Sequence, residues 1–422
     1  MNSSTRNTIA PTASTASTAG TAGTALRRRS LLAALAGAST AGVALTAAAP
    51  ATAAPASASA SASAATSGVG GGPGLTVRGA DLSFLRQSEA AGARYADARG
   101  KVQPAEKLLR AHGANWVRLR VWVDPPTGYS DNAAALELAL RAKRAGMKVL
   151  IDLHYSDFWA DPAHQTTPAA WAGQDLPTLA ATVRAYTAHT LRTLHAAGAR
   201  VDMVQVGNEV TAGMLWPLGQ IYRPGQPDDW TGFTTLLKAG IAGVRDVHPR
   251  PKDVPVMVHI DRGGDNGGSR WFYDHVLTAG VEFEIIGQSY YPFWHGSLHD
   301  LQANFNDLAA RYGKDLVLVE TAYPWTLQNG DDLENLIRER SQLPDAERFP
   351  ATPAGQAAYF KALREVLLAV PHRRGLGFFA WEPAWLPGVG WEPGAGNPND
   401  NLTMFDHDGR ALPALNAFRP SR

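Results

Sequence analysis

The stretch Val204-Gln205-Val206-Gly207-Asn208-Glu209 joins a short apolar run to an amide and a carboxylate. Short runs rich in valine are typical of strands that are buried on both faces. A parallel β/α barrel carries its active-site residues at the carboxyl ends of such strands, which is where Asn208 and Glu209 stand. A Gly-Asn-Glu triplet also occurs in ordinary exposed loops. A catalytic interpretation therefore requires a second carboxylate at the end of another strand.

Eight β-rich runs of this kind follow one another, and helix-compatible segments separate them. This alternation indicates a parallel sheet with helices on both faces. Eight such units over roughly 340 residues predict an α/β fold, a single (β/α)8 TIM barrel with enlarged loops after its strands. The runs lie at residues 76–81, 115–123, 148–155, 201–209, 254–260, 283–290, 316–320 and 375–382. Expected helices include residues 133–145, 176–197, 233–247 and 352–369.

The alternative architecture is an open, doubly wound sheet. That fold usually carries a glycine-rich phosphate-binding turn after its first strand, and Gly79-Ala80-Asp81 does not provide one. The glycine-rich residues 263–268 lack the Lys-Ser/Thr pair of a phosphate loop and lead into Trp271. We interpret them as a flexible loop at the rim of a barrel, and the barrel is the favoured fold.

Composition excludes several classes of protein. The formal net charge is +1 and 18% of the 422 residues are charged, which argues against a nucleic-acid or other polyanion partner. The chain has no cysteine, so disulfides, thiol nucleophiles and thiolate metal sites are excluded. No Gly-x-Ser-x-Gly motif is present, which argues against an esterase. We expect a soluble monomer.

The N-terminal region has the layout of an export signal. Three arginines at residues 27–29 precede an Ala/Leu/Val run, and Ala51-Thr52-Ala53 resembles a cleavage site. We predict a signal peptide over residues 1–53. The paired arginines favour the twin-arginine type, although Arg27 replaces the usual Ser/Thr and leaves the Sec route open. A membrane anchor is the alternative, and the small residues of the run disfavour it.

The segment after the signal is a low-complexity tract. Residues 54–74 are rich in Ser, Ala and Gly, a composition that predicts a disordered linker. The catalytic domain is then expected at residues 75–422. Cleavage of the signal would leave a secreted, extracellular protein with no membrane attachment.

Polar and aromatic residues follow the predicted strands. Glu209 and Glu320 follow the fourth and seventh strands, where a barrel of radius about 7 Å brings their carboxylates to roughly 5 Å, the separation of a retaining glycosidase. The same estimate gives about 6 Å for Glu209 and Glu382, so this geometry leaves both pairs open. The alternative for each carboxylate is an ion pair with Arg118 or Arg120. The expected strand-end residues are Asp81, Arg120, Asp124, His154, Asp157, Asn208, Glu209, Asp261, Tyr290, Tyr291, Glu320, Trp381 and Glu382.

Tryptophans are concentrated near the same strand ends. Their flat apolar faces and polar edges suit the C–H faces of sugar rings. They are Trp122, Trp159, Trp216, Trp294, Trp325, Trp381 and Trp385. His154 could be a metal ligand, but no second histidine stands at ligand spacing on its strand. We favour a hydrogen-bonding histidine in the cleft.

Several longer motifs identify a family. In these motifs the chain resembles the arabinogalactan endo-β-1,4-galactanases of glycoside hydrolase family 53, and the resemblance extends over residues 79–405. The motifs are residues 116–125 (WVRLRVWVDP), 152–162 (DLHYSDFWADP), 204–209 with 213–217 (GMLWP), 264–267 (GDNG), 289–296 (SYYPFWHG), 319–324 (VETAYP) and 381–385 (WEPAW).

The resemblance implies a clan A barrel and a secreted, retaining endo-hydrolase of β-1,4-galactosidic bonds in galactan and type I arabinogalactan. It implies Glu209 as the acid/base and Glu320 as the nucleophile, with Glu382 as a neighbour. Asn208 would contact the sugar 2-OH. We expect a raised pKa for Glu209 and an ionised Glu320 held by Tyr and Arg. The expected substrate contacts are Asp81, Arg120, His154, Asn208, Tyr290, Tyr291, Trp294 and Trp381, with Tyr290 or Tyr291 positioning the nucleophile.

The chain departs from the family in the motif for a structural calcium site, although a calcium site is still expected. Bacterial members with calcium carry a D-x-D-x-H-x-N run after the seventh strand, and residues 329–335 correspond to it. Asparagine can replace aspartate as an oxygen ligand, and the middle residue can use its carbonyl. The expected ligands are Asn329, Asp331, Leu333, Asn335, Asn397 and Asp400. A solvated acidic turn at residues 331–334 is the alternative, and no cofactor is expected for catalysis.

Two other functions remain as alternatives at this point. The first is another clan A specificity, such as a β-glucanase or a mannanase, which the block at residues 289–296 argues against. The second is a carbohydrate-binding barrel that has lost catalysis. The presence of both Glu209 and Glu320 argues against that.

Overall fold

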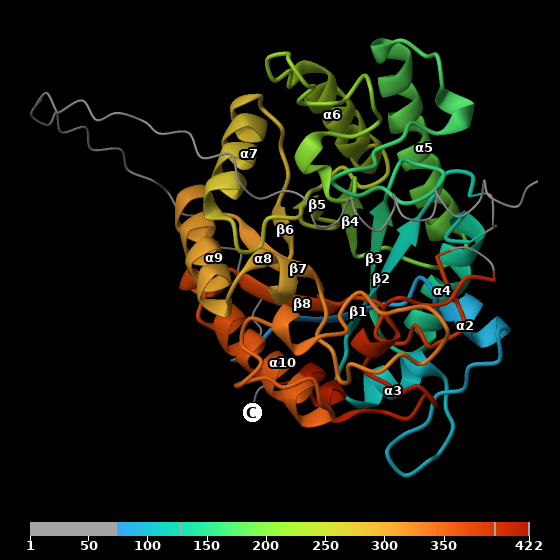
Figure 1. Ribbon diagram of the computed structural model, residues 1–422. Coiled ribbons are helices and arrows are strands. Elements are labelled where there is room, and N and C mark those ends of the chain that lie inside the picture. The colour runs from blue at the N-terminus through green and yellow to red at the C-terminus, as the bar shows by residue number, and fades with distance from the viewer. Residues whose placement is uncertain (1–73, 126–128, 392–393, 421–422) are drawn as a thin grey trace, which may run out of the picture. The chain divides into compact units, whose positions relative to one another are not determined.

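Eight parallel strands pair in chain order and close into a barrel, because β1 also pairs with β8 (Figure 1). The computed structural model describes residues 74–125, 129–391 and 394–420. The predicted (β/α)8 barrel is confirmed. The strands are β1 Val77–Asp81, β2 Trp116–Val121, β3 Lys148–Leu153, β4 Met203–Val206, β5 Val256–Ile260, β6 Ile285–Ser289, β7 Asp315–Thr321 and β8 Gly375–Ala380.

Helices connect the strands and cover the outside of the barrel (Figure 1). The long ones are α4 Asn132–Arg144, α5 Leu176–Ala196, α6 Thr231–Arg245, α7 Asn266–Thr278, α9 Leu298–Tyr312 and α10 Pro353–Leu368. The short ones are α2 Leu85–Ala90, α3 Ala105–Ala111 and α8 Pro292–His295. Single 3-10 turns are η1 Ala169–Trp171, η2 Val210–Ala212, η3 Arg340–Gln342, η4 Pro371–Arg373, η5 Asp400–Leu402 and η6 Pro413–Phe418.

Local capping explains where most of the long helices begin. The side chain of Asp131 accepts from the backbone N–H of Ala134, and that of Asp175 from Thr178. Each such bond satisfies one of the N–H groups that a helix start leaves without a partner. The predicted helix boundaries agree with the observed ones to within about two residues, as expected where caps define the ends.

The glycine-rich residues 263–268 are only partly a loop. Asp265 caps α7 by accepting from the N–H of Gly268 at 2.8 Å, so residues 266–268 form the first helical turn. The loop prediction is therefore wrong for these three residues. A Cβ at Gly264 would lie 1.7 Å from the carbonyl oxygen of His295. Glycine is needed here for close packing against the loop after β6.

The barrel interior changes character along its axis. Its amino-terminal half is an apolar cluster that includes Trp116, Leu150, Met203 and Met257. Two residues further along each of these strands stand Arg118, Asp152, Gln205 and His259, all buried. Residues two apart on a strand point to the same side. The interior is therefore apolar toward the amino-terminal ends of the strands and polar toward their carboxyl ends, where a barrel carries its active site.

Two irregularities in strand pairing lie beside this polar layer. The register between β6 and β7 shifts at Gln288/Ser289, which pairs Ser289 with Glu320. The register between β7 and β8 shifts between Leu318 and Thr321. Such shifts re-aim side chains locally, and these two lie on either side of Glu320.

The predicted signal peptide at residues 1–53 lies outside the described residues, as does the predicted linker at residues 54–74 apart from Gly74. Within the described ranges, no helix combines the length and the apolar character that a membrane span requires.

Candidate active site

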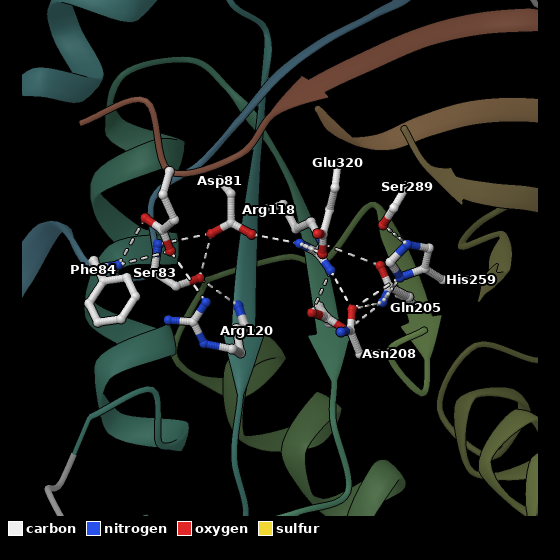
Figure 2. Close-up of polar contacts among 12 residues, drawn as sticks. Asp81, Ser83, Phe84, Arg118, Arg120, Gln205, Asn208, His259, Ser289 and Glu320 are labelled. Atoms are coloured by element: carbon white, nitrogen blue, oxygen red, sulfur yellow. Dashed lines mark hydrogen bonds and ion pairs between the residues drawn. The ribbon is translucent and has the colours of Figure 1, made fainter. Parts of the chain in front are cut away.

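Arg118 lies at the centre of the polar layer and is almost completely buried (Figure 2). Its Nη1 donates to Asp81 Oδ2 and lies 2.8 Å from Glu320 Oε1. Its Nη2 donates to Asp152 Oδ2 at 2.7 Å and to Asn208 Oδ1 at 2.8 Å. One guanidinium thus faces three carboxylates from three strands, and its planar fork sets their relative positions.

Glu320, on β7, is one of these three carboxylates, and 7% of its surface is exposed. Besides Arg118, it accepts from the hydroxyl of Tyr291 at 3.0 Å on Oε2. Burial raises the pKa of Glu320, and Asp152 and Asp81 add to this effect, while Arg118 and the Tyr291 hydroxyl oppose it. Each oxygen of Glu320 therefore has a partner, Arg118 for Oε1 and Tyr291 for Oε2, as expected from the sequence.

Glu209 stands after β4 on a left-handed backbone, with φ 46° and ψ 50°. A non-glycine residue pays about 1 kcal/mol or more for this conformation, and such residues concentrate at functional sites. The side chain is half-buried, and its Oε1 accepts from Ser289 Oγ at 2.6 Å. Burial, and then the carboxylates of Glu320 and Asp261, raise the pKa of Glu209 well above its ordinary value. Of the pair Glu209 and Glu320, Glu209 has the more strongly raised pKa.

Asn208 is buried next to Glu209, and its orientation is determined by three partners. Its Nδ2 donates to the carbonyl of Ala160 at 2.8 Å. Its Oδ1 accepts from Arg118 and, at 3.0 Å, from Gln205 Nε2. The amide therefore has a single orientation at the strand end.

Glu382 forms a separate buried pair after β8. It lies 3.3 Å from Arg120 Nη1 and accepts from the N–H of Phe84 at 3.2 Å. Burial, and then Asp81, raise the pKa of Glu382 well above its ordinary value. The carboxylates that act on Glu209 are Glu320, Asp261 and Asp161. Glu320, and not Glu382, is thus among the charges that act on Glu209, while Arg118 and Arg120 each pair with one glutamate, as the ion-pair alternative expected.

The two tyrosines after β6 point in different directions. Tyr291 reaches Glu320, whereas the Tyr290 hydroxyl donates to the carbonyl of Gly296 at 2.8 Å and its side chain is fully buried. Successive residues of an extended chain face opposite sides. Tyr291 is thus the tyrosine that positions Glu320, and Tyr290 supports the loop after β6 in place of the expected sugar contact.

Three other expected substrate contacts lie beneath the surface. Asp81, Arg120 and His154 are each at most 2% exposed. Asp81 accepts from Ser83 Oγ at 2.6 Å and from Arg118. His154 accepts on Nδ1 from the indole N–H of Trp122 at 3.2 Å, so its Nε2 donates to Asp152 at 3.0 Å. These residues position other side chains, and His154 is the hydrogen-bonding histidine that was favoured over a metal ligand.

The predicted aromatic residues divide into surface and core. Trp294 on α8 is 41% exposed, while Trp381 keeps 9% and packs against Trp159 and Trp391 at 6.4 and 6.0 Å between ring centroids. Trp122 and Trp385 are fully buried. Of the expected aromatic contacts, Trp294 therefore has most surface available to a sugar and Trp381 keeps only a small part, while Trp159, Trp216 and Trp325 are half-buried.

The sequence profile of glycosyl hydrolase family 53 matches residues 77–418. The chain belongs to this family. An arabinogalactan endo-β-1,4-galactanase of Humicola insolens is 37% identical over 353 residues, 82% of this chain and 99% of the relative. A Niallia circulans protein named for the bgaB 5′ region is 44% identical over 346 residues, 81% and 93% of the two chains. The family 53 catalytic domain of Ignisphaera aggregans superposes with a TM-score of 0.77 at 37% identity, over 82% of this chain and 95% of that structure.

The residues expected to hold calcium in this family 53 hydrolase gather where the loops after β7 and β8 meet. Asp331 Oδ2 accepts from the N–H groups of Gly388 and Asn397 at 2.8 and 2.7 Å, and Asn335 Nδ2 donates to Asp400 at 2.8 Å. The side-chain oxygen of Asn335 is buried, and no described group donates to it. An orphaned amide oxygen on a residue that contacts the carboxylate of Asp400 fits a hard cation. Among the described residues, no three acidic or histidine side chains form a metal-binding group, so amide and carbonyl oxygens would complete the shell.

Several residues that contact the site of this family 53 hydrolase were not among the predicted site residues. Asp152, Gln205, His259 and Ser289 all belong to the buried hydrogen-bond network around Arg118 and Glu209. Their signal in the sequence is a polar residue at an inward position of an otherwise apolar strand. Arg118 carried the same signal but was considered only as an ion-pair partner.

Proposed function

We propose that this family 53 hydrolase is a retaining endo-β-1,4-galactanase that acts on galactan and type I arabinogalactan. The Humicola insolens relative that carries this activity in its name supports the substrate. The observation that carries the mechanism is the division of roles between two neighbouring carboxyls. Arg118 and Tyr291 hold both oxygens of Glu320, while burial and Glu320 itself keep the proton on Glu209.

In the first step, a carboxylate oxygen of Glu320 attacks the anomeric carbon. The bond from that carbon to the glycosidic oxygen breaks, and the oxygen takes the proton of Glu209. The shortened chain leaves with its new hydroxyl, and a galactosyl ester on Glu320 remains. Arg118 and Tyr291 orient Glu320 and oppose its protonation, which preserves the nucleophile.

In the second step, Glu209 is ionised and takes a proton from water. The water oxygen bonds to the anomeric carbon, and the ester bond to Glu320 breaks. Two inversions give net retention, and both carboxyls return to their starting states. The pKa of Glu209 falls when Glu320 is esterified, because the negative charge that raised it is removed.

Around these two groups we assign Asn208 to the sugar 2-OH, and Trp381 and Trp294 to stacking against sugar faces. The fixed amide of Asn208 lies beside Glu209. The two tryptophans have surface available at the strand ends. Aromatic faces next to polar edges are suited to sugar rings.

We also propose that calcium binds at Asn329, Asp331, Leu333, Asn335, Asn397 and Asp400. The ion would stabilise the joined loops after β7 and β8 and takes no part in bond cleavage. Calcium at a hundredfold excess over Kd should increase the free energy of unfolding by about 2.7 kcal/mol. The melting temperature should rise accordingly. Calorimetric titration of Asp331→Ala should show no heat of binding. A melting temperature that neither chelator nor calcium changes would contradict the site.

We also propose that the protein is secreted and that it is a monomer. The signal layout of residues 1–53 supports secretion. Mass spectrometry of the mature N-terminus in culture medium and light scattering test these two proposals. An uncleaved protein that stays with the cells would contradict secretion, and a concentration-independent dimer would contradict the monomer.

The experiment for the activity is reducing-end release from potato galactan, with β-glucan and mannan in parallel. Proton NMR of the first product should show the β-anomer. Azide should yield an α-galactosyl azide with Glu320→Ala and a β-galactosyl azide with Glu209→Ala. An α-anomer as first product would exclude retention, preferred cleavage of glucan or mannan would favour the other clan A specificity, and binding without cleavage would favour a carbohydrate-binding protein.

A further inference from the structure

Ser289 connects the acid/base to a buried histidine. It is the last residue of β6, fully buried, and its Oγ lies 2.6 Å from Glu209 Oε1 and 2.8 Å from His259 Nε2. Figure 2 shows Ser289 beside the imidazole of His259, at the opposite end of the polar layer from Phe84. A hydroxyl has one proton to donate, so the direction of these two bonds depends on the protonation of His259.

The surroundings of His259 determine its tautomer. Its Nδ1 lies 3.0 Å from Gln205 Nε2 and accepts from the N–H of Glu209 at 3.4 Å. Asn208 Oδ1 also lies 3.0 Å from Nδ1, but it accepts from Arg118 and Gln205. Burial, and then Arg118 and His154, lower the pKa of His259 well below its ordinary value. The ring is neutral, with Nδ1 as acceptor and the proton on Nε2.

The directions of both Ser289 bonds follow from this tautomer. The Nε2–H of His259 donates to Ser289 Oγ, which leaves the hydroxyl proton to donate to Glu209 Oε1. When Glu209 is protonated, the oxygen that accepts this bond, Oε1, is the carbonyl oxygen of the carboxyl, because a hydroxyl oxygen would direct its own proton elsewhere. The acid proton of Glu209 then resides on Oε2.

We propose that His259 and Ser289 are positioning residues that keep the acid proton of Glu209 on Oε2 and stabilise the carboxylate that remains after its transfer. The inference rests on the proposed role of Glu209 as acid/base. During glycosyl transfer the Oε2–H bond breaks and the glycosidic oxygen gains the proton. The bond from Ser289 to Oε1 then becomes charge-assisted and strengthens. Ser289 and His259 keep their own protons throughout, and a water proton later returns to Oε2.

The test uses the leaving group. Dinitrophenolate departs without protonation, whereas a sugar hydroxyl requires it, and kcat/KM reports the steps up to departure. Ser289→Ala should lower kcat/KM on galactan by roughly ten- to a hundredfold, the loss of one hydrogen bond to a charged group. It should leave kcat/KM on dinitrophenyl β-galactobioside within about twofold. Ser289→Thr, which retains the hydroxyl, should restore most of the loss on galactan.

Controls separate this role from a structural one. Ser269→Ala removes another fully buried serine hydroxyl, one that donates to the carbonyl of Arg262. It should leave kcat/KM unchanged on both substrates. His259→Leu provides a second variant with the same expected leaving-group dependence, and it decides the matter if Ser289→Ala does not fold. Equal losses on both substrates, or an unchanged rate on galactan, would overturn the proposal.

Glu209→Gln distinguishes failure of this inference from failure of the proposed function. It should lose far more activity on galactan than on the dinitrophenyl substrate. If Glu209→Gln shows that dependence and neither Ser289→Ala nor His259→Leu does, only the positioning role fails. If Glu209→Gln lacks it, the acid assignment fails as well.

Discussion

Two arginines on β2, two residues apart, each pair with a buried glutamate, one on β7 and the other just after β8. Arg118 lies 2.8 Å from Glu320, and Arg120 lies 3.3 Å from Glu382. Glu320 also accepts from the Tyr291 hydroxyl, and its negative charge raises the pKa of Glu209. Glu382 instead accepts from the backbone of Phe84, and its arginine packs 4.2 Å from the ring of Trp159. The comparison teaches that two carboxylates with similar burial and an arginine partner each can differ in their other neighbours, and we expect those neighbours to decide which of the two reacts.

The largest expected difference is between the glutamates themselves. Glu320→Gln should reduce kcat on galactan by at least about 10³-fold, because the amide cannot act as the nucleophile. Glu382→Gln should change kcat by less than about tenfold, because Glu382 is held by Phe84 and Arg120, away from Glu209. Steady-state rates of both folded variants measure this. Equal losses would erase the distinction between the two pairs.

The next largest difference is expected between substitutions of the two arginines, measured as the loss of kcat. Arg118→Lys keeps the charge but loses the planar fork that serves Glu320, Asp152 and Asn208 together, and kcat should fall about a hundredfold. Arg120→Lys disturbs a longer contact to a structural glutamate and should cost about tenfold or less. Circular dichroism must show that both variants fold. A greater loss for Arg120→Lys would reverse the assignment.

The tyrosines provide a sharper version of the same comparison. Tyr291→Phe removes a donor to ionised Glu320 and should lower kcat by roughly ten- to a hundredfold. Tyr290→Phe removes a donor to the carbonyl of Gly296 and should reduce the free energy of unfolding by about 1 kcal/mol. Its kcat should stay within about twofold. Denaturant unfolding and kinetics of the two variants check this, and a kinetic defect in Tyr290→Phe would count against it.

The pH dependence of kcat/KM compares the two reacting carboxyls. Because Glu209 must carry a proton, the rate should fall about tenfold per pH unit above its raised pKa. Because Glu320 must be ionised, the rate should fall similarly below its own pKa. A profile on galactan should be bell-shaped, and a dinitrophenyl substrate should lose the alkaline limb. Persistence of that limb would assign it to another group.

The smallest expected effect concerns stability and Glu382. Its folded pKa is raised, so the folded state holds a proton that the unfolded state releases above the ordinary value of 4.5. This contribution is complete below that value and is lost as the pH rises toward the folded pKa. Glu382→Gln should flatten the decline of unfolding free energy above pH 4.5. An unchanged slope in urea unfolding across pH would show that Glu382 is ionised in the fold.

Much of the fold and part of the site could be predicted from local patterns. The eight strand runs and the capped helices are set by apolar periodicity and by short-range hydrogen bonds, such as Asp265 to Gly268. Glu209 and Glu320 could be named because both stand at strand ends and the family motifs include them. Ser289 and His259 could not, because a single polar residue in a strand does not reveal which neighbour it will meet.

The sequence alone determined the barrel, the carboxyl ends of its strands as the site, and the two glutamates as a candidate pair. The family motifs already favoured Glu320 over Glu382, and only the tertiary structure chose Tyr291 over Tyr290 as the hydrogen-bond partner of Glu320. It also placed Asp81, Arg120 and His154 beneath that site. The physical reason is that strand periodicity depends on adjacent residues, whereas hydrogen-bond partners and pKa shifts depend on a few ångströms between residues that lie far apart in the chain.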